Sequence, residues 1–456
     1  MSATGRVPDD TARQLREGLR GQLLQPGDSA YDVARRVDNA MIDRRPALIA
    51  RCAGVADVLH TVRVARARDI PVSVRAGGHN VAGNAVCDGG LMIDVSPMKG
   101  IRVDPQARTA RAEAGVTWGD LDAETQAFGL ATTGGVISTT GIAGLTLGGG
   151  VGWLNGRFGL ACDNLIGADV VTADGQFLRA SEHEHQDLFW ALRGGGGNFG
   201  IVTSFEYRVH SLGPTVLSGP VFHPAARARD VLRFYRDFSA KEPDELTTYA
   251  GLLTGPDGTP LVGVVPCYSG APAEGEKLLK SLRAFGPPVV DQVGPMPYVA
   301  VQRMFNDAFP PGRFNYWKSS LTPAITDDLI DVVIEHMAKV PSPHSAVMLE
   351  HYHGAYSRPA PAATAYHHRR TTYDVVIIGN WTDPADNDRN IAWARKLFQA
   401  VQPQTSEAVY VNFLDRDDGP DRVRAAYGEN YERLVAVKRQ YDPTNFFRMN
   451  QNIRPD

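Results

Sequence analysis

Residues 72–83 read VSVRAGGHNVAG, and this stretch decides how the N-terminal half of the chain folds. Its first residues alternate between apolar and polar, as in a half-buried strand. The double glycine suits a tight turn whose backbone N–H groups can approach an anion closely, because no Cβ stands in the way. His79 follows directly, so its imidazole would lie beside whatever the turn holds. The pattern predicts either an ordinary turn or a cofactor-binding loop.

The residues before this loop predict a helix. Apolar residues recur at helical spacing from Val55 to about Asp69, and Ile70-Pro71 ends the helix before the strand begins. This helix–strand–loop order differs from the strand–loop–helix order of a Rossmann motif. No G-x-x-x-x-G-K-[ST] pattern occurs in the chain, which excludes a P-loop NTPase.

Two further segments are rich in glycine. Residues 134–159 contain ten glycines interleaved with apolar residues, and residues 194–200 read GGGGNFG just before an apolar strand. The apolar side chains indicate that such a segment is buried. The glycines allow its backbone to approach another group, such as a flat or bulky ligand, closely. A tightly packed β-meander would explain the first segment alone. Two separate glycine-rich loops in one α+β unit favour a large nucleotide cofactor spread across it.

The pattern of apolar and polar residues changes at Pro214. The following residues predict long alternating strands with amphipathic helices between them, which suggests one antiparallel sheet covered by helices on one face. The predicted strands are 247–253, 261–267, 345–352 and 373–380, and the predicted helices are 225–240, 273–285 and 326–340. The expected fold class is therefore α+β, with a helical tail over residues 421–439.

The overall composition excludes several classes of protein. The 456 residues carry a net charge of only −4, so no broad basic field indicates nucleic acid or a membrane surface as a partner. Four cysteines are widely spaced, without a C-x-x-C pair, so we expect no disulfide and a reducing compartment. The N-terminus is polar and no apolar run reaches 18 residues. We expect a cytoplasmic protein.

Several motifs together resemble one known family. Arg75–Asn80, Gly141–Trp153, 162–165 (CDNL) and Asp187–Val202 resemble FAD-linked oxidases of the vanillyl-alcohol oxidase/p-cresol methylhydroxylase (PCMH) superfamily. The tail from Tyr427 to Ile453, which contains YGENYERL and DPTNFFR, is similar to the C-terminal segment of berberine-bridge-like enzymes.

The resemblance implies a division of the chain. Residues 1–40 would form a mobile lead-in and a short helix, residues 41–213 a two-part PCMH-type FAD-binding domain, and residues 214–405 the substrate domain. Residues 406–456 would close over the flavin.

The resemblance also implies how the cofactor is held. In the family, the histidine at the position of His79 bonds covalently to the 8α-methyl group of the flavin. Some relatives add a second link through a cysteine, but Ile137 stands at that position here. Cys162 lies beyond the segment, where a buried small side chain is the expected role, so we predict a single covalent link.

Other residues are implied to surround the FAD. The residues that would wrap the pyrophosphate are Arg75, Ala76, Gly77, Gly78, Asn80, Val81, Gly83 and Asn84. Those that would line the isoalloxazine and ribityl chain are Thr139, Gly141, Gly144, Gly148, Gly149 and Gly150. Ile201 and Val202 would lie near the adenine, and Asn450 and Asn452 would close over the flavin.

The candidate catalytic residues come from two predicted strands. Alternation places Glu350 and Tyr352 on one face of 345–352, and Tyr410 and Asn412 on one face of 408–413. The second stretch matches the family strand that carries an active-site tyrosine or asparagine, although Phe413 replaces the usual tyrosine of plant relatives. Each side chain could also be an ordinary strand residue.

The expected reaction is transfer of a hydride from a small organic substrate to the flavin. Glu350 or Tyr410 would accept a proton from an adjacent O–H or N–H, and Asn412 would orient the substrate. We prefer Glu350, because an unperturbed tyrosine titrates near ~10. Molecular oxygen would reoxidise the flavin, although Ile142 leaves oxidase and dehydrogenase activity both open.

The substrate stays open: an alcohol, an amine, a sugar or a secondary metabolite. A flavin-dependent cyclase of secondary metabolism and a catalytically silent flavin-binding protein are the alternatives, and a homodimer is possible. No metal site is predicted. His351 and His353 face away from Glu350, and 183–185 (HEH) lies in a polar turn, so both groups are expected at the surface.

Overall fold

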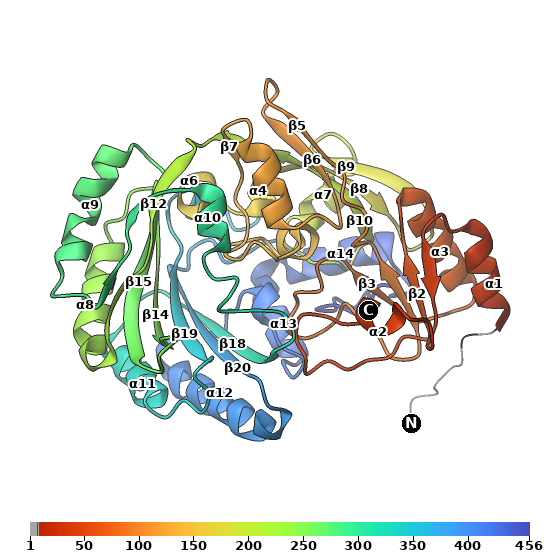
Figure 1. The fold of residues 1–456 in the computed structure, drawn as a ribbon. Helices are drawn as coiled ribbons and strands as arrows, with labels where there is room; N and C mark the ends of the chain where they lie inside the picture. The colour runs from red at the N-terminus through yellow and green to blue at the C-terminus, as the bar shows by residue number, and fades with distance from the viewer. Residues whose placement is uncertain (1–6, 8) are drawn as a thin grey trace.

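The computed structural model describes residue 7 and residues 9–456, so most of the expected lead-in before the first helix lies outside the described residues. The chain forms an N-terminal unit and a sheet-and-helix unit side by side, and the C-terminal segment returns to the N-terminal unit (Figure 1). The class is α+β, as the sequence predicts.

The first sheet of the N-terminal unit carries the His79 loop at the end of β3. Its strand order is β1-β2-β4-β3, and β4 pairs in parallel with both β2 and β3. The strands are Gln22–Leu24 (β1), Leu48–Arg51 (β2), Val72–Arg75 (β3) and Leu91–Asp94 (β4); the helices are Asp9–Gly18 (α1), Tyr31–Ala34 (α2) and Val55–Ala67 (α3).

Residues 9–40 are not a separate lead-in. Strand β1 pairs with β2, and α1 packs against α3. The Asp57 carboxylate ties the two segments together, because it accepts hydrogen bonds from the backbone N–H groups of Arg20, Gly21 and Ala53. This segment therefore belongs to the first sheet.

A second, antiparallel sheet completes the N-terminal unit, with strand order β5-β6-β10-β8-β9. Its strands are Ile101–Asp104 (β5), Thr109–Glu113 (β6), Leu165–Val171 (β8), Phe177–Ser181 (β9) and Ile201–Arg208 (β10). Helix α4 (Trp118–Gln126) begins with the capping box formed by Thr117 and Asp120. Helix α7 (Gln186–Leu192) leads into the second glycine loop, and β7 (Leu130–Ala131) pairs with β11 (His210–Ser211).

Residues 134–159 do not form a β-meander. They form coil with two short helices, α5 (Ile142–Leu147) and α6 (Asn155–Phe158). The glycines explain why: a Cβ on Gly152 would lie 1.8 Å from the carbonyl oxygen of Gly134, so two stretches of coil touch backbone to backbone. Gly149 and Gly150 have φ of 119° and 91°, which side chains rarely adopt.

The second unit is built on one nine-stranded antiparallel sheet, with the path β16-β13-β15-β14-β19-β20-β18 and with β12 and β17 at its edge. Its strands are Thr215–Ser218 (β12), Val221–Pro224 (β13), Leu246–Thr254 (β14), Pro260–Tyr268 (β15), Val290–Asp291 (β16), Gly294–Pro297 (β17), Phe314–Thr322 (β18), Ala346–His351 (β19) and Tyr373–Trp381 (β20).

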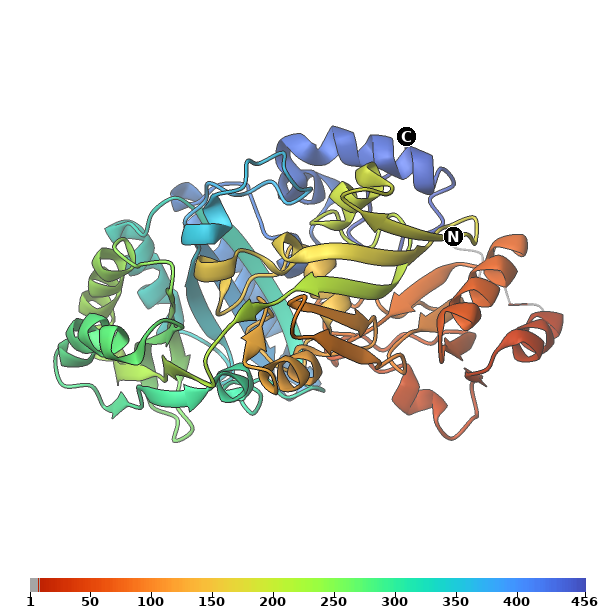
Figure 2. The same ribbon diagram turned by 90° about the horizontal axis from the view of Figure 1, so that it is seen from above.

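Helices cover the outer face of this sheet, as expected (Figures 1 and 2). They are Ala228–Ser239 (α8), Pro272–Ala284 (α9), Asp327–Met337 (α11) and Asn387–Val401 (α12), while α10 (Tyr298–Arg303) contacts α4. Buried Leu and Val side chains of the helices and of alternate strand positions form this core. The other face of the sheet is turned toward the N-terminal unit.

The C-terminal segment differs from the prediction at two points. Residues 408–413 are not a strand: the N–H of Phe413 donates to the carbonyl of Tyr410 (2.9 Å), closing a 3₁₀ turn over Val411–Phe413. The tail helix is divided at Gly428, whose φ is 51°, into α13 (Pro420–Tyr427) and α14 (Tyr431–Tyr441). Helix α14 packs against α7, and the hydroxyl of Tyr427, at the end of α13, donates to the carbonyl of Gly195 in the second glycine loop (3.2 Å).

A buried lysine joins this segment to the glycine loop. The Nζ of Lys438 donates to Asp442 (2.7 Å), to the carbonyl of Asn198 (2.8 Å) and to that of Phe447 (2.9 Å), and both charged side chains are fully buried. Such a cation, bonded on three sides, fixes the tail against the loop.

Replacing Lys438 by methionine should lower the free energy of unfolding by about 3–5 kcal/mol, because it leaves the buried Asp442 carboxylate without its cation. Urea unfolding measures the loss. Lys339→Met is the matched control: Lys339 pairs with Glu335 on the surface, and its loss should cost less than about 1 kcal/mol. Equal losses in the two variants would contradict the structural role of Lys438.

Candidate active site

A cavity of about 890 Å³ lies between the two units. The His79 loop, the α5 region, the second glycine loop and the C-terminal tail line one part of it, and the inner face of the large sheet lines the other. One continuous space therefore connects the predicted cofactor loops with Glu350, Tyr410 and Asn412, whereas Tyr352, also predicted to be catalytic, is outside the lining.

Most of the predicted cofactor residues line this cavity. They are Ala76, Gly77, Gly78, His79, Asn80, Val81, Asn84, Gly141, Gly144, Ile201, Val202 and Asn450. Arg75, Gly83, Thr139, Gly148, Gly149, Gly150 and Asn452 are outside the lining. Gly148 and Gly149 instead accommodate the side chains of Asn412 and Tyr366, and the N–H of Gly150 donates to the hydroxyl of Tyr410 (2.9 Å).

The His79 imidazole is held by one of its two nitrogens. Its Nε2 lies 3.2 Å from the hydroxyl of Thr139 and 3.8 Å from the carboxylate of Asp38. Burial raises the pKa of Asp38, and the nearby imidazole opposes this shift. Nδ1 makes no hydrogen bond with any described residue, and the side chain lines the cavity. Nδ1 is thus the nitrogen left for a bond to a ligand.

The lining fits a large cofactor that has both flat and polar parts. A Cβ on Gly77 would lie 2.6 Å from the backbone nitrogen of Gly141, so the two glycine loops meet where no side chain could fit. The side-chain oxygens of Asn80 and Asn450 are buried on this wall without a hydrogen-bond partner among the described residues. Buried polar atoms of this kind normally have partners, and a cofactor would supply them.

Sequence reasoning missed part of this wall. Gly196, Gly197 and Gly200 of the second glycine loop line the cavity, as do Tyr427 and Gln451 of the tail. The glycine run and the tail motif marked these segments, but no local pattern distinguishes the lining residues from their neighbours.

Glu350 lies on the opposite wall and belongs to a buried pair of carboxyl groups. It stands directly across from Asp374 in the β19–β20 register. The hydroxyl of Tyr352 donates to Glu350 (2.6 Å) and lies 3.5 Å from Asp374, and the hydroxyl of Ser319 donates to Asp374 (2.6 Å). Burial, together with the Asp374 charge, raises the pKa of Glu350 to about 8, and burial raises that of Asp374 to about 7.

Tyr410 and Asn412 lie close together, although on a turn and not on a strand. The Nδ2 of Asn412 donates to the hydroxyl oxygen of Tyr410 (2.7 Å), which also accepts from Gly150. Burial raises the pKa of Tyr410 well above its usual value. Its hydroxyl therefore stays protonated near neutral pH, which leaves Glu350 as the more suitable proton acceptor.

Replacing Asp374 by asparagine should flatten the pH dependence of stability. A carboxyl with a raised folded-state pKa stabilises fully below its unfolded pKa of about 4, and this stability is lost as the pH rises through the folded value. The wild-type urea midpoint should therefore fall between about pH 4 and 8, and Asp374→Asn should remove part of that fall, because buried Glu350 and Glu242, whose pKa values are raised to about 8, keep their share. The exposed Glu276→Gln is the control and should leave the fall unchanged.

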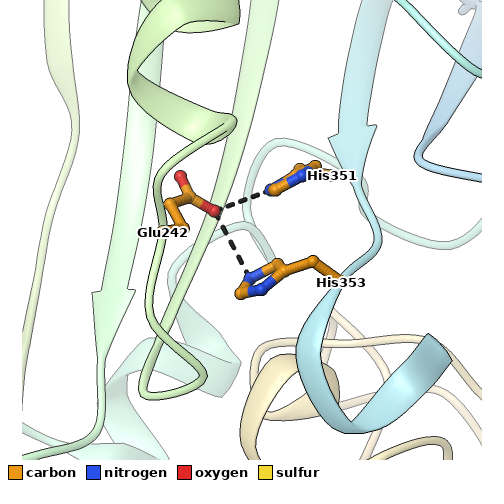
Figure 3. Close-up of side chains that lie close together, drawn as sticks. All are labelled: Glu242, His351 and His353. Carbon is orange, nitrogen blue, oxygen red and sulfur yellow. Dashed lines mark hydrogen bonds and ion pairs between the residues drawn. The ribbon is translucent and has the colours of Figure 1, made fainter. Parts of the chain in front are cut away.

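The expectation that His351 and His353 lie at the surface is wrong. His351 is only 3% exposed, and its Nδ1 lies 2.8 Å from the carboxylate of Glu242, which follows α8 (Figure 3). The Nε2 of His353 lies 3.4 Å from the same carboxylate oxygen. The alternation of side chains along the strand correctly predicted that His351 faces away from Glu350. That face of the strand is not solvent-exposed, however, because the end of α8 covers it.

Three such ligand atoms within 4.8 Å of one another could hold a metal ion. The two imidazole rings stack, however, with centroids 4.6 Å apart and planes 14° apart, so their lone pairs do not converge. The Nε2 of His353 also hydrogen-bonds the carbonyl of Leu246 (2.8 Å). Burial raises the pKa of Glu242 to about 8 and lowers that of His351 to about 4, so a neutral hydrogen-bonded cluster explains these contacts.

The other sequence expectations concern side chains away from the cavity. Residues 183–185 are exposed, as expected. Cys162 is fully buried outside the cavity lining, and burial raises the pKa of its thiol. Among the described residues, no helix is both long and apolar enough to cross a membrane.

The fold, the site and the comparisons with known proteins together define a flavin-dependent oxidoreductase. A family model described as FAD binding domain matches residues 46–181, and one described as berberine and berberine-like matches residues 409–454. The chain belongs to this family of FAD-linked oxidoreductases with a berberine-like C-terminal segment, and it is an enzyme.

Its relatives match over nearly their full length. (R)-6-hydroxynicotine oxidase of Paenarthrobacter nicotinovorans is 32% identical over 96% of this chain and 97% of its own. An FAD-linked oxidoreductase of Dictyostelium discoideum is 30% identical over 96% of both chains. The crystal structure of 6-hydroxy-D-nicotine oxidase from Arthrobacter nicotinovorans superimposes with a TM-score of 0.89 at 31% identity, covering 96% of this chain and 98% of that one.

Proposed function

We propose that the protein is an oxidase that holds FAD through one covalent bond to His79 and oxidises a small organic molecule at the inner face of the large sheet. The observation that carries this proposal is the single cavity that joins the free Nδ1 of His79 to Glu350. Cys162 would carry no second link, because it is buried away from this cavity.

The His79 loop and the second glycine loop would hold FAD, which would supply hydride-accepting chemistry next to the substrate, with molecular oxygen as the final two-electron acceptor and hydrogen peroxide as its product. Glu350 would remove the proton from the adjacent O–H or N–H, since its Oε2 is held by Tyr352 while no described residue donates a hydrogen bond to Oε1. The carbonyl oxygen of the Asn412 side chain and the protonated hydroxyl of Tyr410 would orient the substrate.

Acid precipitation of the purified protein tests the covalent bond: yellow colour should stay in the pellet, and a peptide that contains His79 should carry the mass of the flavin. Anaerobic mixing with a panel of alcohols, amines and sugars should then identify a compound that bleaches the flavin. Admission of air should restore the colour with one peroxide per substrate oxidised. A pigment that leaves completely on denaturation would contradict the covalent link.

A further inference from the structure

The part of the cavity wall formed by the large sheet and the 410–413 turn is aromatic and apolar. The rings of Trp317 and Phe413 lie 5.7 Å apart between centroids, and those of Phe413 and Tyr410 lie 4.9 Å apart. The other strand side chains on this part of the wall include Tyr249, Met348, Val376 and Ile378, and Phe305, in the loop after α10, also lines the cavity. Flat rings at these separations offer their faces or edges to another flat ring.

Few polar side chains of the strand interiors and the 410–413 turn are free, whereas Asp307, Arg313 and His344 line the cavity from the loops before β18 and β19. Glu350 Oε1 and the side-chain oxygen of Asn412 accept no hydrogen bond from the described residues. The third group is the hydroxyl of Tyr249, which is buried and has no partner among the described residues. Each hydroxyl of a sugar would need its own partner here, and burying one without a partner costs free energy.

Tyr249 stands beside the proposed proton acceptor. It lies directly across from Glu350 in the β14–β19 register, so both side chains are on the inner face of the sheet, and both line the cavity. Its side chain is only 1% exposed. A buried hydroxyl without a partner is rare in folded proteins, and one on a cavity wall indicates a hydrogen bond to a ligand.

We propose that the substrate is a planar aromatic molecule with one O–H or N–H for Glu350 and a second polar atom for the hydroxyl of Tyr249, and that polyhydroxylated molecules such as sugars bind poorly. The aromatic wall stacks on the ring, and Tyr249 fixes its rotation in the plane. This inference rests on the proposed function, because the site is taken to lie next to bound FAD.

Binding of three probes to the FAD-loaded protein tests the substrate class. The probes are 4-hydroxybenzyl alcohol, its saturated counterpart 4-(hydroxymethyl)cyclohexanol, and glucose, each titrated while the flavin absorbance spectrum and the heat of binding are followed. The aromatic probe should bind at least about threefold more tightly than its saturated counterpart, which has the same polar groups. Glucose should bind most weakly.

Replacement of Tyr249 by phenylalanine tests the hydrogen bond. The variant should bind the aromatic probe about fivefold more weakly, with no loss of thermal stability, because the hydroxyl has no partner among the described residues. Tyr298→Phe is the matched control: its hydroxyl is also buried without a partner among the described residues, but it lies outside the cavity lining. It should leave binding unchanged.

Three results would overturn the inference: equal binding of the aromatic and saturated probes, tighter binding of glucose, or no binding of any probe at millimolar concentration. Unchanged binding in Tyr249→Phe would remove the role of its hydroxyl. A protein that takes up no FAD would instead contradict the proposed function, and the flavin spectrum distinguishes that failure before any probe is added.

Discussion

Replacement of His79 by alanine is expected to abolish the acid-stable retention of FAD. The variant should still bind FAD when native, because the glycine loops, the Asn80 and Asn450 side chains and the C-terminal tail remain in place. On acid precipitation its pellet should be colourless, whereas the wild-type pellet should be yellow. The reason is chemical: His79 is the nucleophilic side chain on the loop itself, and none of the four cysteines lines the cavity.

Flavin fluorescence in a denaturing gel, together with the intact mass, measures the covalent fraction. His183→Ala is the matched control, since it removes an exposed histidine of the polar turn and should leave the covalent fraction unchanged. Cys162→Ala should also leave it unchanged. Acid-stable flavin in His79→Ala would refute the assignment of a single link, and its loss on combining His79→Ala with Cys162→Ala would point to a second link through Cys162.

The sequence predicted the parts of the fold that depend on local patterns. Helix α3 was predicted within two residues, because the residues that decide it are neighbours in the chain. Strand β18 was missed because residues 314–322, FNYWKSSLT, do not alternate between apolar and polar. Polar side chains occur on both faces of this strand: Lys318 donates to Asp417, and Ser319 donates to Asp374. Polar partners from distant segments cannot be inferred from such a run.

Only those residues of the candidate site that could be recognised by their own type and sequence neighbours were predicted. His79 and Glu350 stood out by their types and neighbours. Tyr249 did not stand out, because aromatic residues are common in strands. Only the structure shows that its hydroxyl is buried without a partner among the described residues and that it lies across from Glu350. His351 was misjudged for the related reason that Glu242, its buried partner, comes from the end of α8, 109 residues away in the chain.

Replacement of Glu350 by glutamine is expected to slow flavin reduction by about 10²–10⁴-fold, because it removes the group that accepts the substrate proton. Stopped-flow bleaching with a compound that reduces the wild-type flavin measures the rate. The wild-type rate should rise with pH, reach half of its maximum near pH 8 and level off above about pH 9, since Glu350 must be ionised to act and its pKa is raised to about 8. In Glu350→Gln this rise should be absent. Glu276→Gln, an exposed carboxylate exchange, should retain both the rate and its pH dependence.

Replacement of Tyr410 by phenylalanine separates the two candidate bases. Burial raises the pKa of Tyr410 far above neutral, so its hydroxyl is a hydrogen-bond donor between pH 6 and 9 and not a proton acceptor. Tyr410→Phe should therefore cost less than Glu350→Gln and should keep the rise in rate toward pH 8. If Tyr410→Phe abolished that rise while Glu350→Gln kept it, the tyrosine would be the base. The carboxyl pair of Glu350 and Asp374 would then serve only to hold Tyr352.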